Sequence, residues 1–559
     1  MDRRAWLKHY DEGVPHTLEY SSLPLHAILD VTARDHPNAT STIFYGARLT
    51  YADVAALSHR FAAGLQADGV RKGDRVALML PNAPQYVIAY FGALRAGATV
   101  VPLNPLYTAP EVHRTLADSG AVALVVLSRM YATAVEAVRD TTVRRVVVTS
   151  IKEYMTPMMR ALFTLTRERK DGHRVDIRSD AMARSFRDLL RHARQPDAVD
   201  VSPDDLAALL YTGGTTGVPK GAMLTHRAFL ANAVQARAWF RDSAPGRDVS
   251  LGLMPLFHCY GLSNVLHLSV LTAAAIVLLP RFDIKELLAA VQRYRPNQFA
   301  GAPRVYVAIN NAPESKRYDL RSIKVCLSGS APLPVEVSER FESLTGGRVV
   351  EGYGLTEAAP STHCNPLYGF RKVGSIGVPF PDVDAKIVDL QTGTRELGVG
   401  EVGELAVRGP NLMSGYWGRP EESALVLRDG WLYTGDVARM DEDGYFYIVD
   451  RKKELVIVSG FNVYPREVEE VLYAHPAVLE AAAIGVPHAD RGEVVKAFVV
   501  LRPGARATSE ELIEHCRGSL ARYKVPASLE FRQELPKSTV GKVLRRDLAE
   551  EERAKRTAV

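Results

Sequence analysis

The chain has 559 residues, of which 47% are hydrophobic and 24% are charged. A chain of this length exceeds a single hydrophobic core, and its composition is that of a folded protein, so we expect two or more globular domains. The formal net charge of +5 is small for the length and gives no reason to expect nucleic acid as a partner.

The sequence gives little indication of disulfide bonds, a zinc site, a signal peptide or a membrane-spanning segment. The four cysteines stand apart without a Cys-x-x-Cys pair, which argues against a zinc site and a disulfide framework. The first residues, Met-Asp-Arg-Arg-Ala-Trp, lack the apolar core of a signal peptide, and the most apolar run, residues 270–279, is too short to cross a bilayer. We therefore expect a cytoplasmic protein that is soluble or peripheral at the inner face of the membrane.

The first 150 residues alternate strands with helices. Apolar runs at residues 75–80, 99–102, 121–127 and 143–149 predict buried strands. Between them, Pro84 begins one helix, and Thr108 with Glu111 forms a capping box for another. Repeated strand–helix–strand units predict an α/β fold with a mostly parallel sheet and helices on both faces.

Residues 151–194 interrupt this alternation. Methionine, leucine and phenylalanine side chains at positions 155–165 are interleaved with, and followed by, arginine and lysine. A basic amphipathic segment of this kind can lie on a membrane surface, although such a helix more often covers its own domain. The sequence leaves both interpretations open.

A glycine- and threonine-rich stretch at residues 211–221 lies between apolar runs at 206–210 and 222–224, which predict two strands joined by a loop. Its glycines let the backbone approach a ligand, its threonines add hydroxyl groups and its lysine adds positive charge. These residues are Gly213, Gly214, Gly217, Thr212, Thr215, Thr216 and Lys220. The chemistry suits phosphate, but Val218 and Pro219 separate Gly217 from Lys220, so the stretch is not a Walker A loop.

The remainder of the chain predicts one more helix of the first domain and then a second domain. Thr225 is expected to cap a helix that places Phe229, Ala233 and Ala236 on one core-facing side. Beyond residue 450, strands are predicted at 478–486 and 493–501, followed by a helix that starts at Thr508 and runs to about Tyr523. We predict a large domain at residues 1–449 and a small α+β domain at residues 450–559.

The stretch at 211–221 resembles the phosphate loop of the adenylate-forming superfamily, which includes acyl-CoA synthetases, adenylation domains of peptide synthetases and luciferases. These proteins join a carboxylate to the α-phosphate of ATP and expel pyrophosphate, so they must hold ATP with Mg²⁺. The resemblance implies that the seven residues named above bind ATP and that Thr215 also contributes to the metal site.

A second motif, Glu351-Gly352-Tyr353-Gly354-Leu355-Thr356-Glu357, resembles another core motif of the superfamily. Tyr353 offers a flat face to adenine, Thr356 a hydroxyl to a phosphate oxygen, and Glu357 an oxygen ligand to Mg²⁺. The resemblance makes Thr356 and Glu357 catalytic and the other motif residues part of the ATP site. The ATP-binding residues expected here and in the run Ser328–Leu333, which resembles the adenine-pocket lining, are Glu351, Gly352, Tyr353, Gly354, Gly329, Ser330 and Ala331.

The C-terminal part carries three further resemblances. Asp436, in Tyr433-Thr434-Gly435-Asp436, is expected to bind the ribose hydroxyls together with Arg451. By the same resemblance Asp450 is the hinge between domains, and Gly460 lies beside the tunnel for the coenzyme A thiol. Lys542 is expected to be the catalytic lysine that bridges the substrate carboxylate and the α-phosphate.

The run 254–261 resembles the wall of the acid-binding pocket. His258 is expected to position the acid rather than act as a base, because a carboxylic acid is already ionised at neutral pH. A histidine buried in the core is the alternative. The run shows no charged group that would hold an amino acid's ammonium, which favours an apolar substrate.

The resemblance covers nearly the whole chain and is strongest to bacterial long-chain fatty acid–CoA ligases, with Glu454 standing where aspartate is commoner. It implies ATP-dependent ligation of a fatty acid to coenzyme A through an acyl-AMP intermediate, with release of AMP and pyrophosphate and with Mg²⁺ as cofactor. The alternatives are a fatty acyl-AMP ligase that loads a carrier protein, an aryl- or medium-chain acyl-CoA ligase, a luciferase-like oxygenase, and a non-catalytic nucleotide- or acyl-binding protein. Acyl length and oligomeric state stay open, with a homodimer as one possibility.

Overall fold

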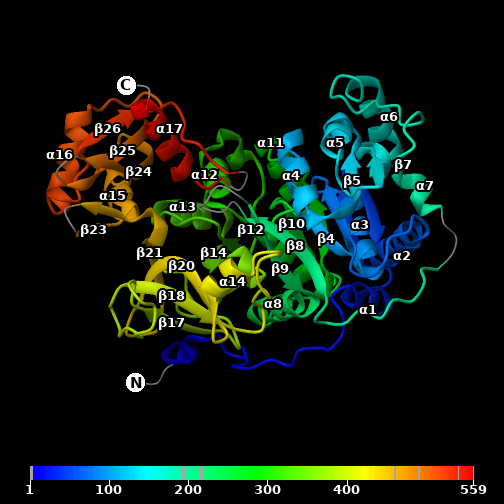
Figure 1. Cartoon of the computed structure of the whole chain (residues 1–559), viewed down its shortest axis with the longest axis horizontal. Helices are drawn as coiled ribbons and strands as arrows, with labels where there is room; N and C mark the ends of the chain where they lie inside the picture. Colours follow the sequence, from blue (N-terminus) through cyan, green and yellow to red (C-terminus); the bar gives the residue numbers. More distant parts are fainter. Residues whose placement is uncertain are drawn as a thin grey trace. The chain divides into compact units, whose positions relative to one another are not determined.

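The computed structural model describes residues 4–191, 195–212, 219–458, 461–488, 491–538 and 541–557 (Figure 1). The chain divides into two compact units. The N-terminal unit comprises Leu7–Asp384 and Arg408–Gly430, and the C-terminal unit comprises Met1–Trp6, Ala385–Val407 and Trp431–Val559. The C-terminal unit therefore includes strands that precede residue 450, and the domain boundary at 449/450 stays a prediction.

One sheet of the N-terminal unit contains, among the described residues, seven strands in the order β7-β6-β5-β3-β4-β8-β9. Neighbours are parallel except β8 and β9, which form an antiparallel hairpin. Every residue of β5 is buried, as expected for a strand covered on both faces. The strands are β3 (Arg75–Met79), β4 (Thr99–Pro102), β5 (Ala121–Leu127), β6 (Arg145–Thr149), β7 (Ala183–Ser185), β8 (Leu206–Thr212) and β9 (Lys220–Thr225).

A second sheet of this unit has nine strands within the described ranges, in the order β16-β15-β14-β13-β12-β10-β11-β1-β2. The run from β14 to β1 is parallel, and β2, β15 and β16 pair antiparallel at the two ends. The strands are β1 (Thr40–Phe44), β2 (Ala47–Thr50), β10 (Val249–Gly252), β11 (Ala275–Leu278), β12 (Gln298–Gly301), β13 (Val325–Ser328), β14 (Arg348–Gly354), β15 (Ser361–Cys364) and β16 (Val378–Pro379).

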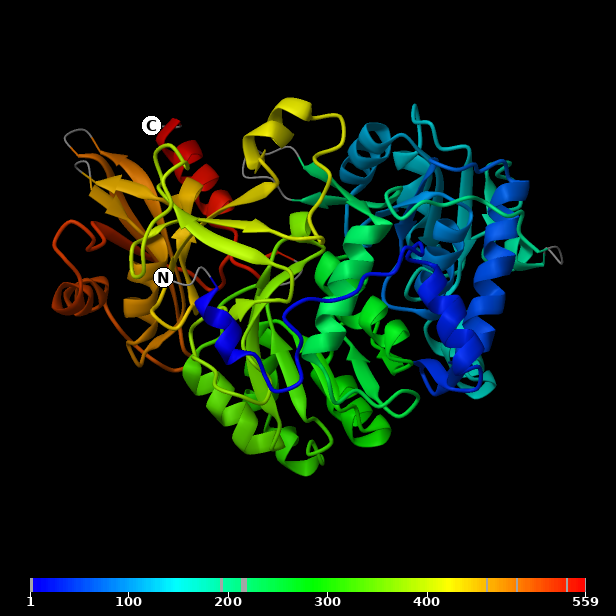
Figure 2. The ribbon, with the colours of Figure 1, turned by 90° about the horizontal axis from the view of Figure 1, so that it is seen from below.

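Helices lie on both faces of these sheets (Figure 1, Figure 2), which confirms the predicted α/β class. The predicted capping box of Thr108 and Glu111 is present, and the Thr225 hydroxyl accepts the backbone N–H of Ala228 at 3.1 Å. The helices are α1 (Ala27–Asp35), α2 (Tyr51–Ala67), α3 (Pro84–Arg95), α4 (Ala109–Ser119), α5 (Tyr131–Ala137), α6 (Pro157–Thr166), α7 (Phe186–Leu190), α8 (His226–Trp239), α9 (Cys259–Gly261), α10 (Leu268–Leu271), α11 (Ile284–Tyr294), α12 (Pro303–Asn311), α13 (Val335–Thr345) and α14 (Pro420–Val426).

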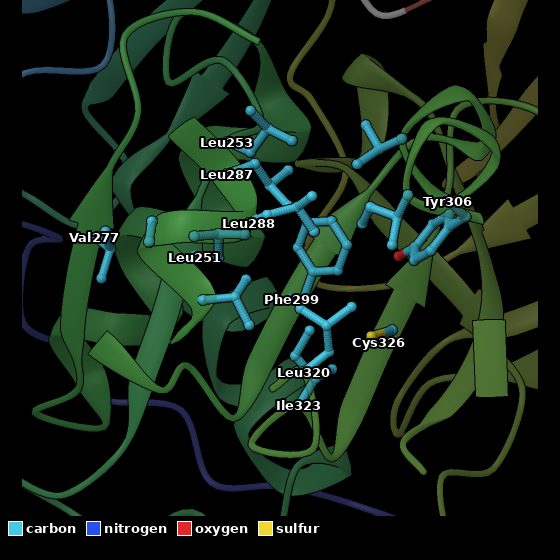
Figure 3. Packing of buried hydrophobic residues seen from close by; sticks show 14 of the residues in the cluster. Leu251, Leu253, Val277, Leu287, Leu288, Phe299, Tyr306, Leu320, Ile323 and Cys326 are labelled. Atoms are coloured by element: carbon cyan, nitrogen blue, oxygen red, sulfur yellow. The ribbon is translucent and has the colours of Figure 1, made fainter. Parts of the chain in front are cut away.

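A buried apolar cluster fixes the parallel strands of the nine-stranded sheet (Figure 3). Phe299 on β12 packs against Tyr306 on α12 with ring centroids 5.3 Å apart, and Tyr306 meets Phe341 on α13 edge-on at 5.0 Å. Full burial of one such side chain is worth about 1.5–3 kcal/mol. The packing therefore holds α12 and α13 against this sheet.

The C-terminal unit is built on two sheets. Strands β17 (Asp384–Val388), β18 (Gly403–Arg408) and β20 (Trp431–Met440) follow one another in the first, and β21 (Phe446–Arg451) also pairs with β20. The second contains β22 (Val456–Val458), β23 (Phe461–Val463), β24 (Val478–His488), β25 (Gly492–Leu501) and β26 (Ser528–Phe531). Its helices are α15 (Pro465–Tyr473), α16 (Ser509–Ser519) and α17 (Arg545–Thr557).

Helix α16 ends four residues before the predicted end near Tyr523. Leu520 takes extended backbone angles, and a turn follows in which Lys524 donates its N–H to the Ala521 carbonyl at 2.8 Å. Pro526 stands shortly beyond, and the residue before a proline avoids helical angles. The predicted end near Tyr523 is therefore wrong, because the turn ahead of Pro526 ends the helix at Ser519.

Helix α6 has no fully buried residue, and its side chains Met158, Leu162 and Leu165 are exposed. Met159, Arg160 and Phe163 are half-buried, so the helix covers its own unit on that side, and contact of the exposed side with a membrane stays a prediction. No helix within the described ranges has both the length and the apolar character that crossing a bilayer requires.

Candidate functional site

The predicted phosphate loop joins two paired strands. β8 and β9 run antiparallel and end in the pair Thr212 and Lys220, which confirms the two strands expected on either side of the loop. Gly213, Gly214, Thr215, Thr216 and Gly217 lie outside the described residues. Of the predicted loop, the structure therefore places its two ends.

Lys220 is held by residues that no sequence motif predicted. Its ammonium forms an ion pair with Glu422 on α14 and lies 5.3 Å from the ring centroid of Tyr416. Both an acidic partner and an aromatic face stabilise a cation. The positive charge at the end of the hairpin is thus fixed in place, and the only sequence signal for these partners was the Gly-Tyr-Trp run at 415–417.

Residues 413–417 connect this hairpin to the second motif. Ser414 donates its N–H to the Met223 carbonyl at 2.9 Å, and Met413 donates to the Glu357 carbonyl at 2.8 Å. The Tyr416 hydroxyl donates to Glu357 Oε1 at 2.8 Å. Burial and the nearby Glu357 carboxylate raise the pKa of Tyr416, so its phenol stays protonated and acts as the donor.

The second motif comprises the last four residues of β14 and the three residues after it, at the carboxyl end of the parallel strands. A Cβ at Gly354 would lie 2.0 Å from the Pro360 carbonyl oxygen, and one at Gly352 would lie 2.8 Å from Leu327 Cδ1. Position 354 therefore requires glycine, because its neighbour is backbone, whereas at Gly352 the neighbour is the end of a flexible leucine side chain. Between them, the Tyr353 ring meets His363 edge-on with centroids 5.9 Å apart.

Thr356 and His258 belong to neighbouring segments. The Thr356 hydroxyl lies 3.4 Å from the Cys259 sulfur, and His258 Nδ1 accepts the Tyr260 N–H at 3.2 Å. Burial lowers the pKa of His258 to about 4, so the ring is neutral at pH 7 and carries its proton on Nε2. Burial raises the pKa of the Cys259 thiol to about 12, which makes it a poor nucleophile.

The predicted adenine segment follows β13. Gly329 donates its N–H to the Gly301 carbonyl at 3.2 Å, and a Cβ at Gly329 would lie 3.2 Å from the Tyr260 ring. Ser330 next to it has φ +73° and is exposed, and Ala331 is half-buried. The Tyr260 hydroxyl donates to the Leu327 carbonyl at 2.7 Å, which ties the His258 segment to β13.

Glu351 has its carboxylate engaged by backbone groups. Its oxygens accept the Leu333 N–H at 3.1 Å and the Gly374 N–H at 3.0 Å. It thus fixes two loops beside the strand end. The segments after β10, β13 and β14 all leave the carboxyl ends of parallel strands, which is where open α/β sheets bind ligands.

In the C-terminal unit, three predicted residues form one charged cluster. Asp436 on β20 pairs in register with Arg451 on β21, and Arg451 Nε lies 3.0 Å from Asp436 Oδ1. Burial, followed by the Arg451 charge, lowers the pKa of Lys542 to about 8, while Asp436 acts in the opposite direction. Lys542 donates its backbone N–H to the Ser538 hydroxyl at 3.1 Å, which closes its loop.

Asp450 lies in a second, buried charge network. Its carboxylate accepts the backbone N–H of Arg451 at 2.8 Å and of Arg466 at 2.7 Å, and Arg545 Nη1 lies 3.2 Å from it. Arg545 also pairs with Glu469 at 2.6 Å and with Glu454. Burial raises the pKa of Asp450, and the Arg545 charge opposes that rise.

Arg545 could not be predicted from a motif, because its only sequence signal is its place three residues after Lys542. Burial lowers the pKa of Arg545, but its ion pairs outweigh burial and raise it overall. Gly460, the predicted tunnel residue, lies outside the described residues.

Comparisons with known proteins place the chain in a family. Residues 29–417 match the family described as AMP-binding enzyme, and residues 467–542 match the AMP-binding enzyme C-terminal domain. A long-chain-fatty-acid–CoA ligase of Bacillus subtilis (strain 168) is 47% identical over 99% of both chains. A feruloyl-CoA synthase of Amycolatopsis sp is 38% identical and covers 92% of this chain and 96% of its own length.

A solved structure agrees with these sequence matches. The crystal structure of ATP-bound MatB from Rhodopseudomonas palustris is similar with a TM-score of 0.83 and 31% sequence identity, over 95% of this chain and 99% of that one. The match to the first family model extends over more than half of the chain. The chain belongs to the AMP-binding enzyme family.

Proposed function

We propose that the protein is an AMP-forming long-chain fatty acid–CoA ligase, which uses ATP and coenzyme A as co-substrates. The observation that carries this proposal is the 47% identity to a ligase of that name over 99% of both chains. The matched region covers 99% of the chain and therefore includes the hairpin, the strand-end segments and the charged cluster described above. Acyl-CoA, AMP and pyrophosphate are the products.

In the first step, a carboxylate oxygen of the acid attacks the α-phosphorus of ATP, and the bond to pyrophosphate breaks. We assign the phosphates to the β8–β9 loop with Thr212, Lys220 and Thr356, where Lys220 exchanges Glu422 for a phosphate. Lys542 neutralises charge between the carboxylate and the α-phosphate. Tyr353 and residues 329–331 receive the adenine, and Asp436 with Arg451 receives the ribose.

Glu357 suits a role in holding Mg²⁺, with Thr215 as the second ligand. Mg²⁺ prefers oxygen ligands and is bound through one or two carboxylates together with substrate phosphates. The hydrogen bond from Tyr416 orients the Glu357 carboxylate. When bound, the ion neutralises charge on the phosphates.

In the second step, the sulfur of coenzyme A attacks the acyl carbonyl carbon, and the bond to AMP breaks. We propose that residues 450–559 rotate about Asp450 between the steps, withdrawing Lys542 and bringing Gly460 to the thiol tunnel. Asp450→Pro should slow thioester formation more than adenylate formation, because proline fixes φ. Asp450→Ala is the control that removes the carboxylate but leaves φ free; equal slowing of both steps by the proline variant would contradict the hinge.

His258 positions the acid through its neutral ring rather than by taking a proton. The test of the whole proposal is ATP-dependent acyl-CoA formation for acids from acetate to oleate, with pyrophosphate release measured in parallel. A maximum at long chains with equal amounts of both products supports it. Pyrophosphate without acyl-CoA would instead assign the protein to the ligases that load a carrier protein.

A second candidate is an aryl-CoA ligase, because the feruloyl-CoA synthase covers 92% of this chain at 38% identity. Competition between palmitate and coumarate separates the two functions. We expect palmitate to suppress coumaroyl-CoA formation at equal concentration, and the reverse result would favour the aryl substrate.

We further propose a cytoplasmic enzyme that acts peripherally at the inner face of the membrane and assembles as a homodimer. The exposed apolar side chains of α6 support the membrane contact. Cell fractionation tests the location, and sedimentation equilibrium at micromolar concentration tests the dimer. A protein found wholly in the high-speed supernatant as a monomer would contradict both.

A further inference from the structure

Helix α6 presents an apolar stripe to solvent. Met158, Leu162 and Leu165 are 76%, 51% and 85% exposed. Their spacing of four and three residues places them on one side of the helix, above one another. Side chains of this size are rarely left exposed together, because together they form a patch that water solvates poorly.

The opposite side of α6 already has its contacts. The Phe163 ring meets His173 edge-on with centroids 5.3 Å apart, and Arg160 Nη2 donates to the Glu153 carbonyl at 2.8 Å. Lys152 and Glu168 form an ion pair at 2.7 Å across the two ends of the segment. The helix is therefore fixed to its own unit through that side, and the stripe faces outward as a consequence.

Basic side chains follow the stripe directly. Residues 157–175 contain five arginines or lysines and two acidic residues, Glu168 and Asp171, which gives a net charge of 5 − 2 = +3. Glu168 is engaged by Lys152. Four of the basic side chains are exposed and form no ion pair within the described residues: Arg167, Arg169, Lys170 and Arg174.

We propose that α6 and residues 167–174 form a docking surface for a bilayer that contains anionic phospholipid. The helix lies in the plane of the interface, the three stripe residues enter the acyl region, and the basic side chains contact lipid phosphates. An apolar stripe beside a basic rim is the arrangement of interfacial helices, and α6 with ten residues is too short to span. Charge complementarity thus favours lipid over a neutral protein surface.

The proposal of this docking surface depends on the exposed apolar side chains of α6 and on the positive charge of residues 167–174. It does not depend on the proposed reaction. If the reaction is also as proposed, the surface holds the enzyme where a long-chain acid partitions. If the docking surface is disproved, the proposed reaction can still be correct, and the reverse also holds. A protein that binds vesicles without ligase activity would contradict the function alone, and an active ligase that ignores vesicles would contradict the surface alone.

The test is co-sedimentation of the full-length protein with vesicles of phosphatidylcholine containing phosphatidylglycerol. The double variant Leu162→Glu with Leu165→Glu should lower the partition coefficient by on the order of 10- to 100-fold, because two apolar anchors become charged. Leu106→Glu is the matched control, since Leu106 is 78% exposed in the same unit but lies outside the segment. A loss of binding in the control equal to that in the double variant would overturn the proposal.

The lipid charge is tested separately. Replacing Arg169 and Lys170 with glutamine should weaken binding to the anionic vesicles, and raising the salt concentration should do the same. Equal binding to pure phosphatidylcholine would overturn the electrostatic part. If the leucine variants abolish self-association in sedimentation and leave vesicle binding unchanged, the stripe is an interface between two copies and the proposal is wrong.

A final control confirms that the variants fold. Acyl-CoA formation from acid dispersed in detergent should be the same in the leucine variants and the unsubstituted protein. Delivery of the acid from vesicles should become slower only in the variants of the docking surface. Equal rates from vesicles would contradict a role for this surface in contact with lipid.

Discussion

The two units hold their candidate residues by different means. In the N-terminal unit, backbone groups at strand ends and neutral side chains do most of the positioning, with His258, Cys259 and Tyr416 all kept uncharged by burial. In the C-terminal unit, buried ion pairs around Arg545 hold Asp450. We therefore expect the candidate residues of the N-terminal unit to keep their positions when charges change. In the C-terminal unit, the position of Asp450 should depend on the charge of Arg545.

The largest effect is expected from breaking the buried network. Arg545→Met leaves Asp450 and Glu469 without their cationic partner, and removing one member of a buried pair costs about 3–5 kcal/mol of stability. Hydrogen exchange of the α15 and β24 amides should report the loss. Arg517→Met, which breaks an exposed pair with Glu514, is the control and should change little. Unchanged exchange in the Arg545 variant would contradict the importance of the network.

A smaller effect is expected at the strand end of the N-terminal unit. Gly354→Ala forces a Cβ against the Pro360 carbonyl and should cost about 1–3 kcal/mol, because neighbouring backbone must move. Urea unfolding measures this cost. Gly518→Ala in α16 meets nothing within 4 Å and should leave stability equal or higher. Similar behaviour of the two variants would show that the strand end is not tightly packed.

The hydrogen bond from Tyr416 to Glu357 offers a test of function in the same unit. Tyr416→Phe removes a hydroxyl that donates to a carboxylate, an interaction worth about 1.5–3 kcal/mol. We expect adenylation to slow about tenfold, with a higher requirement for Mg²⁺, as measured by pyrophosphate release. Tyr20→Phe removes an equivalent bond to Asp382 elsewhere in the unit and should leave the Mg²⁺ requirement unchanged.

The charge of Lys542 predicts a pH dependence. Because its pKa lies near 8, below the usual 10.5, kcat/KM for ATP should fall as pH rises through 8, by about tenfold at pH 9. The unfolded chain holds this proton up to pH 10.5, so the free energy of unfolding should rise with pH between 8 and 10.5 relative to Lys542→Met. In Lys542→Arg, the fall in kcat/KM should occur at higher pH. If the fall stays at the same pH, another group causes it.

Local sequence patterns predicted much of the fold. The apolar run at 121–127 matches β5, and the Thr108 capping box is present where Thr-x-x-Glu predicted it. Such features depend on neighbouring residues only. The bonds from Tyr416 to Glu357 and from Arg545 to Asp450 join residues 59 and 95 positions apart, which no local pattern encodes.

The exposed apolar stripe of α6 is a second feature that a local sequence pattern does not determine. Its periodicity predicted an amphipathic helix, yet periodicity does not say whether the apolar side meets protein or solvent. Phe163 and Arg160 decide that by occupying the inner side. The physical reason is again a set of contacts beyond the local pattern.

The most direct test of the two-step account separates the half-reactions in Lys542→Ala, with Lys537→Ala as the control on the same loop. Pyrophosphate release from ATP and palmitate should fall by on the order of 100- to 1000-fold, because one preorganised charge is lost. Conversion of supplied palmitoyl-AMP to palmitoyl-CoA should continue close to the unsubstituted rate. Equal loss of both half-reactions would contradict the account.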